Sequence, residues 1–533
     1  MSRVDMGARY CVTMFHASGD PRHAIRAVLE AGLAGRPHPA CPGAVALVLR
    51  DGETVAEDAV GHALRYADAS GSELPAAEQV PMSSDTLFDL ASLTKLFTTV
   101  VLLSLVDDGA LTLDSPIHAW LPSFSVGVRR SVSVRHLLSH TSGLPAWLQL
   151  WDGHPDADAR RAAVLGAPLE RGAGAAFAYS DLGFMVAGWL AEAVTGTPLA
   201  RLVEQRVCRP LGMADAGFLP SPGLVPRIAA TEDESYAGRG MLRGAVHDEN
   251  AWCLGGAVGH AGVFATARDV ARLGEMIRLG GALDGVRVLG EGTAAEMCAD
   301  QLPAHLDPGF RQGLGVRIGD PGFMGRLSGP LTVGHTGFTG TSLVVDCARG
   351  LTVVLLTNRV HPSRTWSDVG HLRRALADAA MGLDRPARTR HGPRSVEPGP
   401  TAPPEPGPTA PPGPGPTAPP GPGPTAPSGP GPTPSASDAM EAPAEGPGCS
   451  CASGRSCRRC GLPSSVWRSR SSRTRPAPPA CHRHPRRAVR DLPRDRAPVL
   501  PCGGLHLVPH PPSGTGPRDR SRAQRPSDAL AHR

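Results

Sequence analysis

The chain has 533 residues, of which 41% are hydrophobic and 19% are charged. Of its 56 prolines, 34 lie in the last 143 residues, which also carry 19 arginines against 9 acidic residues. The formal charge of +5 therefore divides into +10 for residues 391–533 and −5 for the rest of the chain. A mildly acidic body excludes the basic footprint of a nucleic-acid-binding domain, and a body of this size can bury a large hydrophobic core.

Composition divides the chain into four predicted segments. These are an N-terminal extension (1–20), a globular domain (21–387), a Pro/Gly/Thr/Ala-rich linker (388–448) and an Arg/Pro-rich tail (449–533). The linker repeats an eight-residue unit of the type GPTAPPGP, which favours a solvated polyproline-II spacer, and the tail lacks hydrophobic periodicity, which predicts disorder. Translation out of frame would give an equally unusual composition, and this alternative stays open. The repeats begin at Gly399, Gly407, Gly415 and Gly423.

Cysteine usage predicts neither a metal nor an organic cofactor. The body cysteines show no CxxC or Cys/His pairing, so we expect them to be core thiols. Four tail cysteines suggest zinc, but the first pair is CxC and no second well-spaced pair follows, which argues against it. The body set is Cys11, Cys41, Cys208, Cys253, Cys298 and Cys347, and the four clustered cysteines of the tail are Cys449, Cys451, Cys457 and Cys460.

Hydropathy predicts a cytoplasmic protein without membrane contact. The first thirty residues lack the apolar stretch of a secretory signal, and no apolar run approaches the roughly 18 residues of a membrane-spanning helix. This expectation holds if the start codon is correct.

The first predicted element is a β-hairpin over residues 43–65. Two apolar runs flank Asp51-Gly52, a strong signal for a two-residue hairpin turn. Helices are then expected over residues 93–106 and 179–194, where apolar residues dominate.

Later elements complete the expected domain. A helix should follow Thr266, because Asp269 three residues later suits a capping box. A second hairpin is expected over residues 340–358, and a helix over residues 367–381. The two hairpins should form one antiparallel sheet around a long, mainly helical insert, which places the domain in the α+β class.

One residue stands out chemically before any motif is considered. Lys95 is the only lysine among 54 basic residues, and it follows Ser92 by three positions at the start of an apolar helix. Positions i and i+3 share a helix face, and a lysine, unlike an arginine, can lose its proton and act as a base. The alternative is a capping serine followed by a surface lysine.

Two further motifs accompany Ser92-x-x-Lys95. The strings YSD at 179–181 and GHTG at 334–337 follow it in this order. Together the three motifs resemble those of the serine β-lactamase and penicillin-binding superfamily, in particular its class C β-lactamase-like branch with D-aminopeptidases and family VIII esterases. The resemblance covers residues 24–380 and implies a β-lactamase-like fold with a mainly helical lobe.

The resemblance also implies a role for each motif residue. Ser92 would be the nucleophile that forms an acyl-enzyme, Lys95 its proton acceptor and Tyr179 the phenol that returns the proton to the leaving group. A lysine in a dry site beside a tyrosine should be pushed toward its neutral form. The backbone N–H groups of Ser92 and Phe338 would form the oxyanion hole. The alternative for Tyr179 is a half-buried core aromatic.

The chain departs from the family pattern at two substrate-binding positions. His335, with Thr336 and Gly337, stands where β-lactamases have Lys-Thr-Gly, and a largely neutral imidazole should bind a β-lactam carboxylate poorly. Asp181 replaces the asparagine of the second motif, which exchanges an amide donor for a carboxylate. A structural role for Asp181 is the alternative.

Two other groups of residues have competing interpretations. Arg359 and Arg364, after the last predicted strand, could bind a substrate carboxylate in place of the missing lysine, or lie solvated at the surface. His140 and His260 could form a triad with Ser92, but no GxSxG elbow surrounds any serine, so loop hydrogen bonding is the better interpretation.

The sequence therefore predicts a serine hydrolase that cleaves an ester or amide bond of a small molecule through an acyl-enzyme on Ser92. Esterase or D-amino-acid peptidase activity is favoured over β-lactamase activity. No partner protein is implied. The alternative is a non-catalytic ligand-binding or regulatory protein that keeps the fold.

Overall fold

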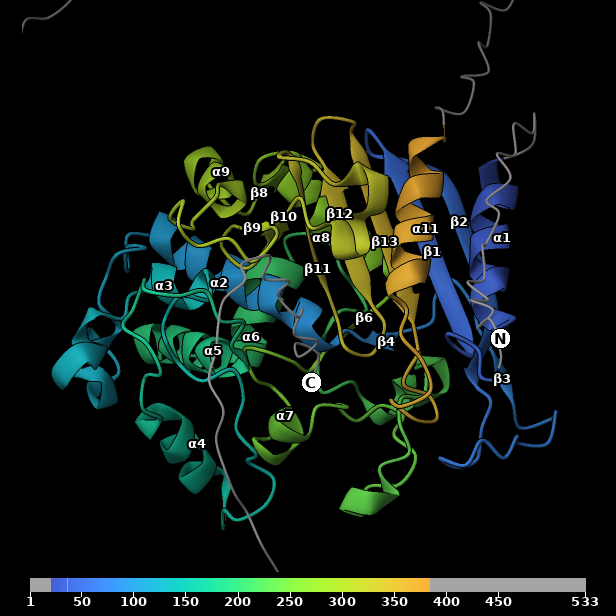
Figure 1. The fold of residues 1–533 in the computed structure, drawn as a ribbon, viewed down its shortest axis with the longest axis horizontal. Coiled ribbons are helices and arrows are strands. Elements are labelled where there is room, and N and C mark those ends of the chain that lie inside the picture. The colour runs from blue at the N-terminus through green and yellow to red at the C-terminus, as the bar shows by residue number, and fades with distance from the viewer. Residues whose placement is uncertain (1–20, 36, 384–533) are drawn as a thin grey trace, which may run out of the picture. The chain divides into compact units, whose positions relative to one another are not determined.

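A computed structural model describes residues 21–35 and 37–383. An eight-stranded sheet forms the centre of this part of the chain, and each strand pairs with its neighbours in antiparallel orientation (Figure 1). In spatial order the strands are β3 (Val80–Pro81), β2 (Glu53–Leu64), β1 (Gly43–Arg50), β13 (Leu351–Thr357), β12 (Ser342–Asp346), β11 (Thr332–Thr336), β10 (Arg317–Ile318) and β9 (Arg311–Gln312).

The two predicted hairpins are confirmed, and they meet at the centre of the sheet. Strand β1 pairs with β2 on one side and with β13 on the other, with Ala46 opposite Leu355. Asp51 and Gly52 both have positive φ, at 51° and 83°, as a two-residue hairpin turn of the predicted kind requires. The first and last strands of the domain are thus neighbours, although the helical insert separates them in sequence.

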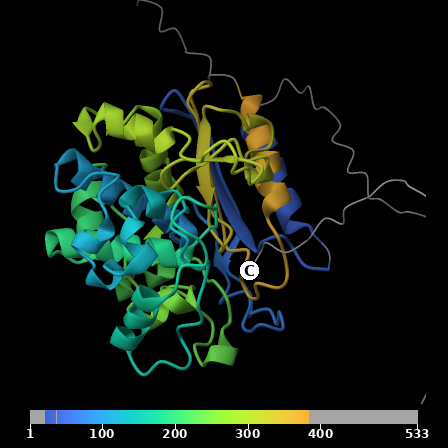
Figure 2. The ribbon, with the colours of Figure 1, turned by 60° about the vertical axis from the view of Figure 1, so that its left-hand side comes forward.

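Helices cover both faces of the sheet. On one face α1 (Pro21–Leu33) and α11 (Gly370–Met381) pack against alternate residues of β1, including Ala46 and Val48. On the other face Val45 and Leu47 join the larger core, which α8 (Ala267–Arg278) and the helical lobe complete. Figure 2 shows α1 and α11 to the right of the sheet and the lobe to its left.

The lobe is built around α2 (Thr94–Asp107) and α5 (Asp181–Thr195), which pack against each other. The capping box of Thr266 and Asp269 at the start of α8 is confirmed. The helix expected from residue 179 begins at Asp181, because the Ser180 side chain accepts the Gly183 N–H and caps it. Helix α10 (Pro321–Met324) packs against α11 on the other face of the sheet. The remaining elements are α3 (Val134–Leu138), α4 (Ala157–Gly166), α6 (Leu199–Val203), α7 (Glu249–Cys253), α9 (Glu291–Cys298) and the short strands β4 (Phe88–Asp89), β5 (Gly217–Phe218), β6 (Val263–Ala265), β7 (Ala282–Leu283) and β8 (Val286–Arg287).

The cysteines divide between core and surface. Cys41 and Cys208 are buried, and burial raises the pKa of each thiol to about 12. Cys347 is exposed, which corrects the expectation that all body cysteines are core thiols, because it lies in the turn between β12 and β13.

Within the described residues, no helix combines the length and apolarity needed to cross a bilayer. The predicted N-terminal extension, the repeat linker and the tail with its six cysteines lie outside the described residues, so the proposed domain boundaries stay predictions.

Candidate active site

Ser92 and Lys95 lie together where the chain enters α2. Ser92 belongs to a short 3₁₀ turn, Ala91–Leu93, and Lys95 occupies the first turn of the helix that follows. The Lys95 Nζ donates to Ser92 Oγ at 2.9 Å. The ammonium group is fully buried, with 0% of the side chain exposed. The surface-lysine alternative is therefore wrong.

Asp181 provides the counter-charge for this lysine. Its Oδ1 lies 2.7 Å from Lys95 Nζ, and the carbonyl of His260 accepts a further bond from the same nitrogen at 3.3 Å. Asp181 is the first residue of α5, where the positive end of the helix dipole favours an anion. The ammonium group thus makes an ion pair with Asp181 and donates hydrogen bonds to Ser92 and to the His260 carbonyl.

This pairing corrects the expected protonation state of Lys95. Burial is the largest single effect and acts to lower the pKa of Lys95, but Asp181 and Tyr179 together outweigh it and raise the pKa above its ordinary value. Lys95 is therefore an ammonium at neutral pH in the free protein. The sequence could not show this, because Asp181 lies 86 positions after Lys95.

Tyr179 lies beside the lysine with its ring packed between imidazoles. The Lys95 Nζ is 4.9 Å from the centre of the Tyr179 ring, and the rings of His140 and His335 lie 4.5 Å and 6.0 Å from it. The Nδ1 of His140 accepts the N–H of Ser180, which fixes the backbone next to the tyrosine. Tyr179 is thus held over the Ser92–Lys95 pair.

His335 lies in β11 as a neutral, incompletely paired imidazole. Its Nδ1–H donates to the Thr336 carbonyl at 2.8 Å, which leaves Nε2 as a buried acceptor without a partner among the described residues. Burial, followed by the charges of Lys95 and Arg317, lowers the pKa of His335 well below its usual range. The third motif therefore presents an acceptor where the family pattern has a cation.

The turn after β11 is bound to the segment that leads to Ser92. Thr339 and Thr341 donate their hydroxyls to the carbonyls of Asp89 and Leu90, at 2.7 Å and 2.9 Å. Gly337 is required here, because a Cβ would lie 2.3 Å from the Leu90 oxygen. These contacts explain why the motif needs a glycine and fix the turn relative to the nucleophile segment.

The two predicted oxyanion-hole donors are unoccupied. Within the described chain, neither the Ser92 N–H nor the Phe338 N–H donates to a protein acceptor. Phe338 is 41% exposed, while its carbonyl accepts from Arg359 Nε at 2.7 Å. The contact with Arg359 restrains the backbone at Phe338, and the role of the two N–H groups as an oxyanion hole stays a prediction.

The histidine triad receives no support. His260 Nε2 lies 2.9 Å from Asp248 Oδ1, and the His140 imidazole accepts from the Ser180 backbone. In the part of the chain that the structure describes, neither ring bonds to Ser92. Both histidines are hydrogen-bonding loop residues, as expected.

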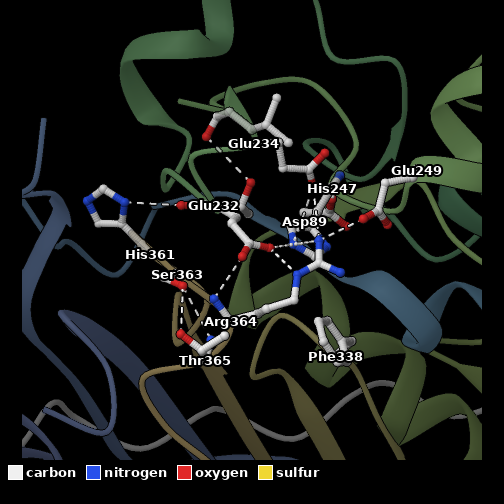
Figure 3. Close-up of polar contacts among 12 residues, drawn as sticks. Asp89, Glu232, Glu234, His247, Glu249, Phe338, His361, Ser363, Arg364 and Thr365 are labelled. Atoms are coloured by element: carbon white, nitrogen blue, oxygen red, sulfur yellow. Dashed lines mark hydrogen bonds and ion pairs between the residues drawn. The ribbon is translucent and has the colours of Figure 1, made fainter. Parts of the chain in front are cut away.

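Arg364 has partners that the sequence analysis missed. Its guanidinium contacts Glu232, Glu234 and Glu249, with Nη2 2.8 Å from Glu249 Oε1 and 3.2 Å from Glu234 Oε1 (Figure 3). The same nitrogen donates to the Tyr236 hydroxyl at 2.8 Å. A guanidinium that already contacts three carboxylates is poorly suited to capture a fourth, so the proposed substrate-binding role of Arg364 loses its basis.

Three side chains of the same cluster are arranged so that they could bind a metal ion. Ligand atoms of Glu232, Glu234 and His247 lie within 4.8 Å of one another. The guanidinium of Arg364 contacts both carboxylates, and Arg239 also pairs with Glu234 at 2.7 Å. The protein's own cations therefore neutralise these carboxylates.

Arg317 is a basic residue close to Tyr179 that the sequence did not point to. It lies in β10 opposite Gly334 of β11, and its guanidinium carbon is 5.7 Å from the centre of the Tyr179 ring. Only Nη1 is paired, with Asp320 at 2.8 Å. No motif surrounds Arg317, so only the strand register reveals its position.

Comparisons with known proteins agree with this arrangement. The Beta-lactamase family profile matches residues 25–378. A protein of Escherichia coli K12 named "Putative D-alanyl-D-alanine carboxypeptidase" is 32% identical over 360 residues, which span 60% of this chain and 79% of that protein. Among solved structures, EstCE1, a hydrolase with promiscuous acyltransferase activity, superposes with a TM-score of 0.54 at 24% identity, over 68% of this chain and 99% of that one. A penicillin-binding protein homologue from Caulobacter crescentus gives 0.52 at 22% identity, over 68% and 98%.

The chain therefore belongs to the Beta-lactamase family, within the serine β-lactamase and penicillin-binding superfamily. It is an enzyme of the serine hydrolase type, with a β-lactamase-like fold.

Proposed function

We propose that the protein hydrolyses an ester or amide bond of a small molecule through an acyl-enzyme on Ser92. The contact of 2.9 Å between Ser92 Oγ and Lys95 Nζ, beside two unoccupied backbone N–H groups, supports this function best. Attack by the hydroxyl on a carbonyl would place the developing oxyanion between the N–H groups of Ser92 and Phe338. Water then releases the acyl group. All of these groups come from one chain, so the proposal needs no partner protein.

The protonation of Lys95 sets the pH dependence of the proposed acylation. In its neutral form Lys95 would accept the Ser92 proton, and Tyr179 would carry it to the leaving group. Because Asp181 raises the pKa of Lys95, that form is scarce at neutral pH, and kcat/KM should rise through the alkaline range. Asp181→Asn removes the raising charge while burial remains, so the rise should move to lower pH. An unmoved or reversed profile would contradict the base role of Lys95.

The polarity of the site favours esters or D-amino-acid peptides over β-lactams. A neutral His335 lacks the charge that would capture a β-lactam carboxylate, and Asp181 offers a carboxylate instead of an amide donor. Arg317 is a nearby cation with only Nη1 paired among the described residues, and we propose that it receives a substrate carboxylate when one is present. The name of the Escherichia coli relative supports a D-amino-acid peptide as one substrate class.

A substrate panel tests the proposal. One portion of the wild-type protein would be treated with a fluorophosphonate probe, and a separate, untreated portion would be assayed on p-nitrophenyl esters, D-aminoacyl p-nitroanilides and nitrocefin. We expect Ser92 to be labelled, with turnover of an ester or D-aminoacyl substrate at least tenfold above that of nitrocefin. Absence of both labelling and turnover would favour the non-catalytic alternative, and preferred hydrolysis of nitrocefin would reverse the substrate assignment.

A further inference from the structure

Asp89 is a buried carboxylate that bonds to backbone rather than to a cation. It ends β4 and is 2% exposed. Its Oδ1 accepts the Ala91 N–H at 2.8 Å, and its Oδ2 accepts the His247 N–H at 2.6 Å. A carboxylate can accept one such bond on each of its two oxygens, whereas an amide of the same size has one acceptor oxygen and one donor NH₂ group. Asp89 therefore joins the segment before Ser92 to a distant loop.

The first of these bonds stabilises an unusual backbone conformation. Ala91 directly precedes Ser92 and has φ of +47°. A residue with a Cβ adopts this left-handed conformation only where its surroundings enforce it. Because the Ala91 N–H is tied to Asp89, the carboxylate fixes the Leu90–Ala91 peptide, which directly precedes the peptide that carries the Ser92 N–H.

The second bond leads to the other predicted oxyanion donor. The His247 ring stacks on the Phe338 ring, with 5.7 Å between centres and 28° between planes. The imidazole is held in turn by Glu232, at 2.8 Å from Nε2, and Glu232 is fixed by Arg364 (Figure 3). His247 thus contacts Asp89 through its backbone and Phe338 through its side chain.

We infer that Asp89 and His247 are positioning residues that set the separation of the Ser92 and Phe338 N–H groups. This inference rests on the proposed function, because the separation matters only if the two donors bind an oxyanion. The charged cluster around Arg364 then acts as the fixed support of the oxyanion hole, without touching the substrate.

Asp89→Asn tests the inference directly. One backbone N–H would face an amide donor instead of an acceptor, so the hole should be displaced while the substrate pocket stays in place. We expect kcat to fall about 10- to 100-fold, with KM within about threefold of wild type, since loss of a full donor costs about 10²- to 10³-fold. The affinity for an arylboronic acid, which forms a tetrahedral adduct on serine, should fall by the same factor as kcat.

Asp269→Asn is the matched control. Asp269 is also a buried carboxylate that accepts a backbone N–H, from Thr266 at 3.1 Å, but it lies at the start of α8 away from Ser92. Its variant should lower the melting temperature while leaving kcat and boronate affinity unchanged. Equal losses of kcat in both variants would show a general packing effect and overturn the inference.

A second variant addresses the Phe338 side. His247→Gln keeps a donor for Glu232 but removes the ring that stacks on Phe338, so kcat and boronate affinity should again fall together, by about tenfold. Unchanged boronate affinity in both Asp89→Asn and His247→Gln would overturn the inference. Fluorophosphonate labelling of the wild type is measured first: its failure would overturn the proposed function and the inference together, whereas labelled, active wild type with unaffected variants overturns only the inference.

Discussion

In the part of the chain that the structure describes, the buried ionic groups around Arg364 and those around Lys95 differ in how completely their polar atoms are paired. Around Arg364, three glutamates, a tyrosine and a histidine form a cluster in which each ionised side chain has a direct partner. Around Lys95, the ammonium makes an ion pair with Asp181, but Asp181 Oδ1, His335 Nε2 and His140 Nε2 have no hydrogen-bond partner among the described residues. The backbone N–H groups of Ser92 and Phe338 also lack a protein acceptor there.

The difference in pairing indicates that the Arg364 cluster has a structural role and that the Lys95 site is where a reaction takes place. Unpaired buried polar groups cost free energy, so a fold retains them where a ligand or reacting group supplies the missing partner. A completed network resists rearrangement and positions its neighbours. The Lys95 site is therefore the place where we expect chemistry, and the Arg364 cluster is the place where we expect stability.

The largest expected effect concerns the reaction site alone. Ser92→Ala removes the proposed nucleophile and should reduce turnover by at least about 10³-fold, because the remaining groups cannot form an acyl-enzyme. Little packing is lost, so the melting temperature should stay close to that of wild type. Initial rates and thermal unfolding would be measured on the same preparations. Activity within tenfold of wild type would show that another residue is the nucleophile.

Local motifs explain what could be predicted from the sequence. Ser92 and Lys95 share one helical turn, and the hairpin at Asp51-Gly52 carries its own turn signal, so neither depends on distant contacts. Arg364 was misjudged because its partners Glu232 and Glu249 lie 132 and 115 positions away. The sequence does not show which carboxylates surround an arginine, so it cannot show whether that arginine is free to bind a substrate.

The same limit applies to the pKa of Lys95 and to the role of Arg317. Asp181 was recognised as a departure from the family pattern, but its contact with Lys95 exists only when α2 and α5 pack together. Arg317 reaches Tyr179 through the pairing of β10 with β11, for which the sequence carries no signal. Pattern analysis therefore located the reacting residues but not the charges that tune them.

A pair of arginine variants sharpens the comparison. Arg364→Ala leaves Glu232 and Glu234 buried without their common cation and should destabilise the fold by roughly 3 kcal/mol, the low end for a broken buried ion pair, because Arg364 is partly exposed. Arg317→Ala removes a single ion pair, with Asp320, so it should cost less stability than Arg364→Ala, and it should raise KM for substrates with a free carboxylate. Denaturant unfolding and KM for matched carboxylate and methyl-ester substrates would be compared.

The opposite result would invert the assignment of the two arginines. If Arg364→Ala raised KM only for the carboxylate substrate and left stability intact, Arg364 would be a substrate-binding residue after all.

The smallest expected effect is a pH dependence of stability caused by His361, which lies beside the Arg364 cluster (Figure 3). His361 is fully buried, and its Nδ1–H donates to the Thr231 carbonyl at 3.1 Å. Its Nε2 accepts the N–H groups of Arg65 and Tyr66, both at 3.1 Å. Protonation would place a proton between two donors, and burial, the main cause, lowers the pKa of His361 from 6.5 to about 4.

Because the pKa of His361 is lower in the folded state, the unfolded chain binds more protons between pH 6.5 and pH 4. The contribution of His361 to stability is complete above pH 6.5 and should decline by about 2–3 kcal/mol as the pH falls to 4.5. Urea unfolding of wild type and of His361→Gln at pH 7.5 and 4.5 would isolate this effect. The variant should be less stable at pH 7.5 yet lose less on acidification, and equal losses in the two proteins would show that His361 is not the titrating group.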